Sequence, residues 1–289
     1  MEILKNKIDF AVILRVKKAN PNGDPLNGNR PRMDYDGYGE ISDVCIKRKI
    51  RDRLMERTDC SVLIQSDDRK KDDYTSIKAR VDGILSSETQ KDKKRFYSEA
   101  CSQWFDVRAF GQVFAFKSDK KSGKKSEVEN ESPDDTGMSI PVRGPVSIHS
   151  AFSIEPIRPE SIQITKSVNN EDTKGGKKSA DTMGMKHRID KGVYIFFGSI
   201  NPQLAEKTTF SIEDALLLKG ILPKLFENDE SSARPAGSME VYKVIWWDHG
   251  CKTGKYSSAK VHGSLNVNPD GSYSINELPG LTPEQIDGF

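Results

Sequence analysis

The sequence predicts an α+β protein built on one antiparallel sheet with helices on one face. Short runs rich in β-branched and aromatic residues alternate with longer runs that repeat an apolar residue every four positions. Their order is strand, helix, strands, helix, strand. No internal repeat is present, and the pattern suits a fold of the ferredoxin or RRM type into which several polar segments are inserted.

The first predicted strand and helix are separated by a polar loop. Residues 8–17 are rich in β-branched and aromatic side chains and form the strand. Asn, Gly, Pro and Asp crowd residues 18–40, which predicts a loop. The helix covers 42–57, and Ser42 is a suitable N-cap. Its buried stripe should consist of Ile46, Ile50 and Leu54.

The remaining elements follow from the same two patterns. The predicted strands are 61–65, 105–116, 143–157, 161–168, 192–201 and 239–250, and the predicted helices are 91–105 and 211–228. Ser211 and Asp214 form a capping pattern at the start of the second of these helices, which Pro223 should kink. The tail at 268–289 shows a turn, a short strand and a Thr-Pro helix start.

Two polar stretches differ in what they contain. Residues 117–136 are low in complexity and nearly free of apolar side chains, so we expect a mobile loop there. Residues 173–192 are strongly charged, yet they include Met183 and Met185 on either side of Gly184. Methionine usually fills a core, and a solvated loop has none, so the two methionines need another explanation.

Composition limits the classes of function. The net charge is only +2, which excludes a histone-like polycation, so a nucleic-acid surface must arise from segregated charge. The four cysteines show no paired spacing, and His249 with Cys251 gives only a weak indication of zinc. We expect no cofactor. No signal-peptide pattern or membrane-length apolar run is present, and we expect a cytoplasmic protein.

Several segments together resemble a known family. They are NPNGDPLNGNRPRMD, ISDVCIKRKIRD, DVRAFG, RGPVSIHSAFSIEPI and ARPAGSMEVYKV. Their order and spacing, from residue 3 to about 245, resemble the backbone subunit of the type I-C CRISPR surveillance complex, Cascade.

The resemblance implies a single RRM-like domain over 1–289, elaborated like a hand. A helical finger region at about 66–103, a thumb hairpin at about 161–192 and the tail at 268–289 would surround the palm. Copies would polymerise head to tail along CRISPR RNA, together with other Cascade subunits. The thumb would displace one base at regular intervals, and the guide would pair with the invading DNA strand. No membrane partner is implied.

Basic residues on the first helix are candidates for phosphate contact. Lys47, Arg48 and Arg51 lie within about 100° of one another on a helix of 3.6 residues per turn. Such contacts hold a strand without reading its sequence. The alternative is an ordinary solvated helix face, and the resemblance favours the RNA contact. The preceding loop adds further candidates, namely Asn20, Asn22, Arg30 and Arg32.

The methionines are candidates for a wedge between bases. An apolar side chain can hold stacked bases apart, and Lys186 and Arg188 follow the two methionines closely. Gly184 would let the hairpin tip turn tightly. In the alternative, one methionine packs beneath the hairpin. Arg234, in RPAGS, either approaches phosphate or simply belongs to a turn.

The main rival function is a metal-dependent ribonuclease acting on target or precursor RNA. Related subunits of type III complexes cut RNA with an aspartate after the first strand, and Asp24, Asp34 and Asp36 lie there. Asp is also a common turn residue. In type I-C the resemblance assigns precursor processing to another subunit. We therefore expect a non-catalytic binding protein without a metal site.

Overall fold

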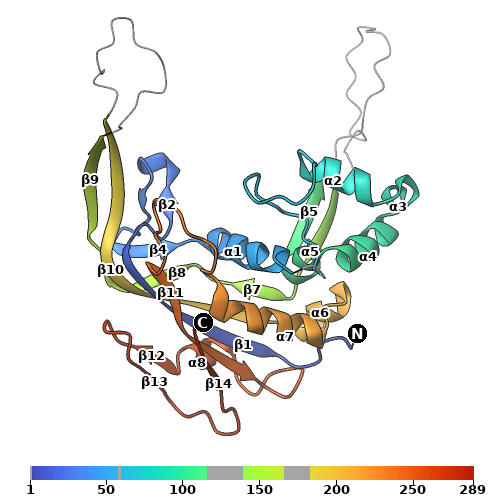
Figure 1. Cartoon of the computed structure of the whole chain (residues 1–289). Coiled ribbons are helices and arrows are strands. Elements are labelled where there is room, and N and C mark those ends of the chain that lie inside the picture. The colour runs from blue at the N-terminus through green and yellow to red at the C-terminus, as the bar shows by residue number, and fades with distance from the viewer. Residues whose placement is uncertain (1, 58–59, 116–138, 166–182) are drawn as a thin grey trace, which may run out of the picture. The chain divides into compact units, whose positions relative to one another are not determined.

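The computed structural model describes residues 2–57, 60–115, 139–165 and 183–289 (Figure 1). The chain divides into two compact units. Unit 1 comprises Met1–Lys5, Leu54–Ser147 and Ile200–Ala215, and unit 2 comprises Asn6–Arg53, Ile148–Ser199 and Leu216–Phe289. The predicted mobile loop at 117–136 lies outside the described residues.

Unit 2 holds most of a large sheet with the strand order β14-β11-β1-β10-β8-β4, and β7 and β9 also pair with β10. Its strands are β1 Ile8–Ala19, β4 Tyr38–Ile41, β7 Val146–Ile148, β8 Ala151–Pro156, β9 Pro159–Thr165, β10 Met183–Ile200, β11 Met239–Asp248 and β14 Glu284–Asp287. The central pair, β1 and β11, runs antiparallel with a bulge between Ile13 and Leu14. The sheet confirms the strands predicted at 8–17, 143–157, 192–201 and 239–250.

The predicted first helix is present as α1, Asp43–Met55. The Ser42 hydroxyl accepts a hydrogen bond from the Cys45 N–H, as expected of an N-cap. Ile46, Ile50 and Leu54 are all buried, which confirms the predicted stripe. The loop before α1 is not wholly irregular. It contains the short elements β2 Gly23–Asp24, η1 Pro25–Asn27 and β3 Arg30–Pro31.

The C-terminal segment packs on one face of the sheet in unit 2. Its elements are α8 Ser258–His262, β12 Leu265–Val267 and β13 Tyr273–Ile275. Val261 and Leu281 join Ala11, Ile245 and Trp247 of β1 and β11 in one apolar cluster. The helix start predicted from the Thr-Pro pair is wrong, because β14 follows it. Proline suits the start of an edge strand, where its missing N–H breaks no ladder bond.

Unit 1 is mainly helical and contains α2 Ile77–Ile84, α3 Ser87–Lys91, α4 Lys93–Gln103, α5 Phe105–Phe110, β5 Gly111–Ala115, β6 Ser139–Arg143 and α6 Pro202–Thr208. The helix predicted at 91–105 is confirmed as α4, and the Asp92 carboxylate caps its N-terminus. The core joins these helices to the β5–β6 hairpin. There the rings of Phe96 and Phe114 pack edge to face, with 4.9 Å between their centroids.

Of two strand predictions in unit 1, one is wrong and the other is right only in its second half. The segment 105–116 begins as helix α5 and becomes a strand only at Gly111, and 61–65 forms no strand. The Asp106 carboxylate accepts hydrogen bonds from the N–H groups of Leu63 and Ile64, at 2.7 and 3.1 Å. A side chain distant in sequence thus satisfies donors that a strand partner would otherwise bind.

The second long predicted helix is α7, Ile212–Ile221, followed by the 3-10 turn η3, Leu222–Lys224. The Ser211 hydroxyl accepts from the Asp214 N–H and the Asp214 carboxylate accepts from the Ser211 N–H, so the predicted capping pattern is confirmed. Asp214 also binds the Arg108 guanidinium through two hydrogen bonds of 2.9 and 2.7 Å. The α-helix ends before Pro223, as its missing N–H requires.

Candidate nucleic-acid interface

Strands β9 and β10 form an antiparallel hairpin whose arms run from Pro159 to Thr165 and from Met183 to Ile189 (Figure 1). The part of the predicted thumb between the arms lies outside the described residues. Gly184 is paired with Ile164 within the arms, so the prediction that it forms the turn at the tip is wrong. The methionines are therefore strand residues.

Met183 and Met185 extend from the same face of β10, since alternate strand residues share a face. They are 57% and 55% exposed. The Met183 sulfur accepts a hydrogen bond from the Gln163 amide at 2.8 Å, on the opposite arm. Neither methionine is buried beneath the hairpin in this unit, so the alternative of a packed methionine has no support here.

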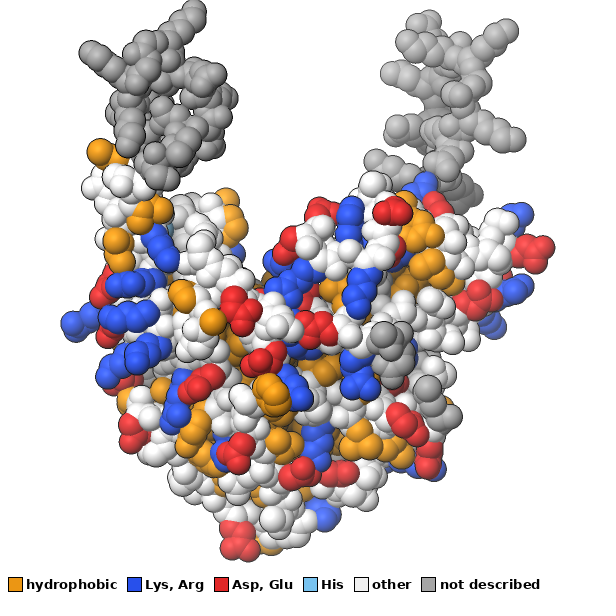
Figure 2. Space-filling model, in the orientation of Figure 1, with side chains coloured by type: hydrophobic (Ala, Val, Ile, Leu, Met, Phe, Trp, Pro, Cys, Tyr) orange, Lys and Arg blue, Asp and Glu red, His pale blue; other side chains and the backbone are white. Residues whose placement is uncertain are grey.

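The basic neighbours of the methionines extend from the other face of the hairpin. Lys186 and Arg188 alternate with Met185 along β10. Arg188 pairs with Glu160 across the hairpin, at 3.2 Å. The Lys and Arg side chains of the molecule gather visibly on the flank where β9 and β10 run (left in Figure 2). The hairpin thus presents thioethers on one side and positive charge on the other.

The basic residues predicted on α1 differ in their environment. Lys47 is paired with Asp43 at 2.9 Å, and Arg48 lies 3.8 Å from Asp52. Arg48 keeps about half of its side chain exposed (53%). Arg51 is half-buried. These i, i+4 pairs hold the cations weakly, so a phosphate can compete with the carboxylates for them.

The asparagines of the loop before α1 serve the loop itself. Asn20 is buried, and its amide donates to the Asn29 carbonyl at 2.7 Å. The Asn22 side-chain oxygen accepts from the N–H and hydroxyl of Ser42, at 3.0 and 3.1 Å. Both asparagines thus fix the loop and its attachment to α1. They do not point into solvent.

The arginines of this loop are more accessible. Arg30 is exposed on β3. Arg32 is half-buried and lies 3.6 Å from the Asp24 carboxylate. Its own N–H donates to the Asn22 carbonyl at 2.9 Å, which fixes the backbone from which the side chain extends. Of the loop candidates, Arg30 is the one best placed to meet a ligand.

Sequence reasoning missed a buried cation on α1. Lys49 lies on the core side of the helix with its side chain 5% exposed, paired with Asp229. Asp229 also binds Arg234, whose Nε lies 3.0 Å from the carboxylate. The predicted candidate Arg234 therefore belongs to a charge cluster shared with α1. The sequence contained a signal for this burial. Lys49 follows Ile46 by three residues, so it lies beside the buried stripe of α1.

Two of the three aspartates of the rival ribonuclease function, Asp24 and Asp34, are engaged in local turns. The Asp34 carboxylate accepts from the N–H groups of Asp36 and Tyr38, at 3.0 and 2.8 Å. Asp24 caps the following 3-10 turn and pairs with Arg32. Across the residues that the structure describes, no three His, Cys, Asp or Glu side chains could hold a metal ion together.

The zinc indication at His249 and Cys251 is not supported. His249 is fully buried in unit 2, and its Nε2 lies 2.8 Å from the Asp9 carboxylate. Its Nδ1 accepts from the Lys255 N–H at 2.9 Å. Both ring nitrogens are therefore occupied, and His249 ties β1 to the segment after β11.

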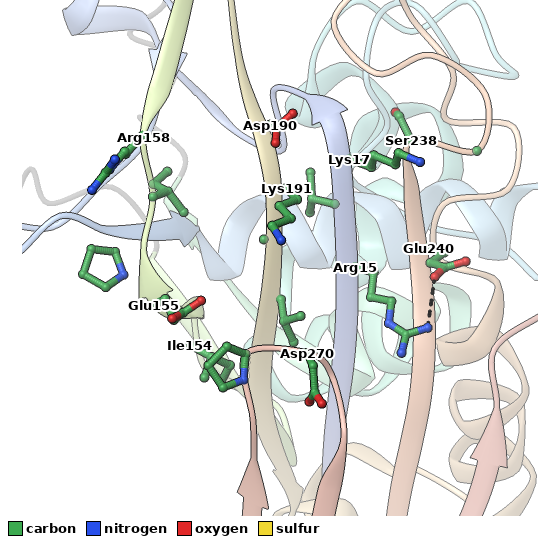
Figure 3. Close-up of a pocket in the computed structure, with 17 residues that line it drawn as sticks. Arg15, Lys17, Ile154, Glu155, Arg158, Asp190, Lys191, Ser238, Glu240 and Asp270 are labelled. Atoms are coloured by element: carbon green, nitrogen blue, oxygen red, sulfur yellow. Dashed lines mark ion pairs between the residues drawn. The ribbon is translucent and has the colours of Figure 1, made fainter.

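A groove of about 970 Å³ lies in unit 2 across the sheet (Figure 3). Its walls come from β1, β8, β10 and β11 and from the β12–β13 turn. Arg15 pairs with Glu240 across it at 3.7 Å. Its basic lining residues are Arg15, Lys17, Arg158 and Lys191, and its acidic ones are Glu155, Asp190, Glu240 and Asp270. The charges balance, whereas a nucleic-acid surface is predominantly positive.

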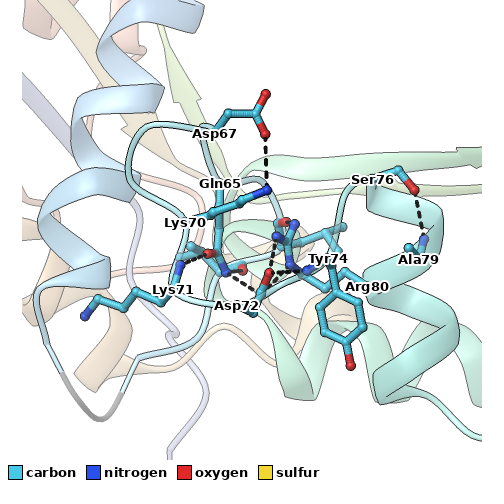
Figure 4. A network of polar contacts seen from close by, with 11 residues as sticks. Gln65, Asp67, Lys70, Lys71, Asp72, Tyr74, Ser76, Ala79 and Arg80 are labelled. Atoms are coloured by element: carbon cyan, nitrogen blue, oxygen red, sulfur yellow. Dashed lines mark hydrogen bonds and ion pairs between the residues drawn. The ribbon is translucent and has the colours of Figure 1, made fainter.

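Unit 1 contains a polar network around a buried arginine (Figure 4). Arg80 binds Asp72 through Nε and Nη2, both at 2.7 Å, and its Nη1 donates to the Leu63 carbonyl at 2.7 Å. The hydrogen bonds from Arg80 hold the pKa of Asp72 below its usual value. Gln65 adds a further contact to Asp72. This network fixes the loop before α2 and is a structural feature.

Within the described residues, no helix combines the length and apolar character needed to cross a bilayer.

Comparison with known proteins adds a family to this geometry. A family model described as CRISPR-associated protein Cas7 matches residues 6–279. The CRISPR-associated protein Cas7 of Haloferax volcanii is 24% identical over 282 residues, covering 94% of this chain and 78% of the relative. A chain of a CRISPR RNA-guided surveillance complex, pre-nicking, aligns with TM-score 0.45 and 16% identity, covering 83% of this chain and 78% of that one.

A second solved structure, of a CRISPR RNA-guided surveillance complex, aligns with TM-score 0.39 and 16% identity, covering 83% of this chain and 68% of that one. Likeness at these TM-scores is too low to support a conclusion about this chain. The family model, in contrast, spans nearly the whole sequence. The chain therefore belongs to the CRISPR-associated protein Cas7 family.

Proposed function

We propose that this chain is the backbone subunit of a type I-C CRISPR surveillance complex. Copies of it polymerise head to tail along CRISPR RNA and hold the phosphate backbone. The bases of the spacer remain available to pair with an invading DNA strand. In such a complex the guide RNA recognises the target sequence by base pairing, and the protein contacts only the RNA backbone. The complex also contains other Cascade subunits and acts in the cytoplasm.

The observation that carries this proposal is the family match over residues 6–279, which includes every basic segment described above. The geometry supports it in unit 2. There the loop before α1, α1 itself and the segment with Arg234 are joined by hydrogen bonds and a shared ion pair. Basic side chains from three separate segments are thereby held close to one another.

The proposal assigns the parts of a hand to the observed elements. The unit 2 sheet with α1 is the RRM-like palm, and β9 and β10 are the arms of the thumb. The helices α2 to α4, within 66–103, are the finger region, and residues 268–289 are the tail. Met183 or Met185 is the wedge that displaces a base. Lys186 and Arg188 contact the backbone from the other face of the hairpin.

The protein is proposed to bind without catalysis. The ribonuclease alternative lacks support, because the carboxylates of Asp24 and Asp34 already bind their own turns and Arg32. A ribonuclease of that class requires a divalent ion, whereas a backbone subunit binds RNA in EDTA and leaves it intact. RNA binding measured in EDTA and in Mg²⁺, with the RNA length checked afterwards, separates the two functions.

Co-purifying RNA tests the proposed function. The chain is expressed with and without a CRISPR array, and the bound RNA is sequenced. We expect array-derived RNA of defined length, covering every spacer of the array about equally. Recovery of random cellular RNA in the presence of the array, or of no RNA, would contradict the proposal.

A further inference from the structure

One carboxylate oxygen in unit 2 binds two cations from different elements. Asp229 Oδ2 accepts from the Lys49 ammonium of α1 and from the Nε of Arg234, the latter at 3.0 Å. Residue 229 lies between the 3-10 turn η3 and strand β11, far from α1 in the sequence. The Asp229 side chain is itself mostly buried (12% exposed). Asp229 therefore links α1 to the segment that carries Arg234.

The buried lysine makes Asp229 necessary for the fold. The Lys49 ammonium is almost inaccessible to water and lies 5.3 Å from the centre of the Phe226 ring. Burial lowers the pKa of Lys49, while the charge of Asp229 opposes that shift. An ammonium left unpaired in this site would be strongly destabilising.

Arg234 retains most of its hydrogen-bonding capacity. A guanidinium has five N–H donors, and only the Nε donor of Arg234 is used in binding Asp229. Within the described residues, the hydrogen bond from the Arg234 side chain is the one that Nε donates to Asp229. The two terminal nitrogens make up the planar fork that binds phosphate with two parallel hydrogen bonds.

The segment around Arg234 is fixed at both ends. The Asn20 N–H donates to the Ala233 carbonyl at 2.9 Å, and the Lys17 N–H donates to the Ser238 carbonyl at 2.8 Å. Ser231 and Arg234 exchange backbone hydrogen bonds of 2.8 and 3.1 Å. The backbone and the Nε of Arg234 are thus both held, so the direction of its fork is determined before a ligand arrives.

The Arg234 side chain meets α1 at the turn that carries its exposed cation. Lys49 and Arg234 bind the same oxygen of Asp229. Arg48 is the residue before Lys49 on α1, and its side chain is 53% exposed. A ligand bound at Arg234 therefore lies beside the part of α1 that carries Arg48.

We propose that Asp229 is a positioning residue that aims the terminal nitrogens of Arg234 at an RNA phosphate beside Arg48. Lys49 is the counter-charge that holds the Asp229 carboxylate in place. The inference rests on the proposed function, because it names how one phosphate of the bound RNA is held. It adds two buried residues, Lys49 and Asp229, to a site whose other proposed members are surface cations.

The test removes the ion pair without leaving a buried charge. In Lys49→Met with Asp229→Leu, both partners become apolar at similar volume, a change that often leaves stability unaffected. Arg234→Ala is made in the wild-type protein and in this double variant. Thermal unfolding and affinity for single-stranded RNA at fixed salt are measured for all four proteins.

We expect the double variant to unfold within a few degrees of wild type and to bind RNA about five- to tenfold more weakly, as loss of one charge-assisted contact implies. Arg234→Ala should cost about tenfold in wild type and less than twofold in the double variant. A double variant that binds like wild type, or an equal cost of Arg234→Ala in both backgrounds, would overturn the inference. If Asp229 only stabilises the fold, Arg234→Ala should cost the same affinity in both backgrounds.

Lys49→Met with Asp229→Asn provides a second route if the first double variant fails to fold. It leaves no buried cation unpaired and retains the shape of Asp229 and an acceptor oxygen, but it lacks both charges. We expect its effect on affinity to be non-additive with that of Arg234→Ala, and strict additivity would overturn the inference. If wild-type protein fails to bind RNA, the proposed function fails. If it binds and Arg234→Ala binds equally well, only the inference fails.

Discussion

Met183 and Met185 extend from the same face of β10, two residues apart, and both remain more than half exposed. Exposed thioethers on a hairpin arm do not contribute to a core. Their shared face suits insertion between bases, which requires apolar surface on one side of a strand. A charged segment can contain two exposed methionines here because Lys186 and Arg188 extend from the opposite face of the strand.

The first prediction concerns these methionines. Met183→Ala with Met185→Ala should change RNA affinity by less than about fivefold, because apolar insertion contributes about 1 kcal/mol or less beside the phosphate contacts. The variant should lose the periodic displacement of bases. A fluorescent adenine analogue placed at successive guide positions measures this, since an unstacked analogue is bright.

Wild-type assemblies should show bright positions at regular intervals, and the double variant should show a uniform signal. Ile164→Ala, on the opposite arm and the other face of the hairpin, is the matched control for loss of exposed apolar surface, and it should preserve the pattern. If the periodic signal persists in the methionine variant, neither methionine is the wedge.

The second prediction concerns α1. Lys47→Ala with Arg48→Ala removes two cations and should make the log–log salt dependence of RNA binding shallower by about 1.4, at about 0.7 per phosphate on single strands. Lys93→Ala with Lys94→Ala removes the same charge from exposed positions on α4 and should leave the slope unchanged. Equal slopes for wild type and the α1 variant would show that α1 makes no phosphate contact.

The third prediction concerns the stability of unit 1. Asp72→Ala leaves the buried Arg80 guanidinium without its carboxylate and should cost about 3–5 kcal/mol. Hydrogen exchange of the α2 and α4 amides reports this loss within unit 1. Asp67 is 95% exposed beside Lys70, so Asp67→Ala should change stability by less than about 0.5 kcal/mol. Similar exchange in both variants would refute the role given to Asp72.

The fourth prediction concerns acid. The folded-state pKa of Asp72 lies below its unfolded value of 3.8 because Arg80 donates to the carboxylate. A depressed carboxyl pKa gives stability that is fully present above the unfolded pKa and is lost as pH falls through the folded pKa. The deficit of Asp72→Asn relative to wild type should therefore be constant from about pH 5 to 7 and shrink below about pH 4. Urea unfolding across this range measures it, and a deficit that grew towards acid would contradict the assigned shift.

Sequence alone predicted the parts of the fold that depend on local chemistry. The N-cap at Ser42, the stripe of α1 and the reciprocal caps of Ser211 and Asp214 are set by neighbours within one helical turn. The strand predicted at 61–65 failed because the N–H groups of Leu63 and Ile64 bind the Asp106 carboxylate, more than forty residues away. That contact has no local signature.

The sequence shows which candidate residues are charged, but it does not show which of them are held by the protein's own contacts. Lys47 and Arg48 are accessible or weakly paired, as a surface site requires, but Asn20 and Asn22 serve the loop and α1. Asp229 could not be found from sequence, because nothing around it shows that α1 lies within hydrogen-bonding distance. Buried charge pairs join distant segments, and a pattern of side chains along one segment does not reveal them.

The most direct test of the account is the mass of assemblies formed on RNAs of increasing length. Purified chain is mixed in EDTA with single-stranded RNAs of unrelated sequences, and each complex is weighed by mass photometry. The account predicts that the number of protomers rises in regular steps with RNA length, that sequence makes no difference, and that the RNA stays intact. A fixed number of protomers at every length, or binding restricted to one sequence, would contradict it.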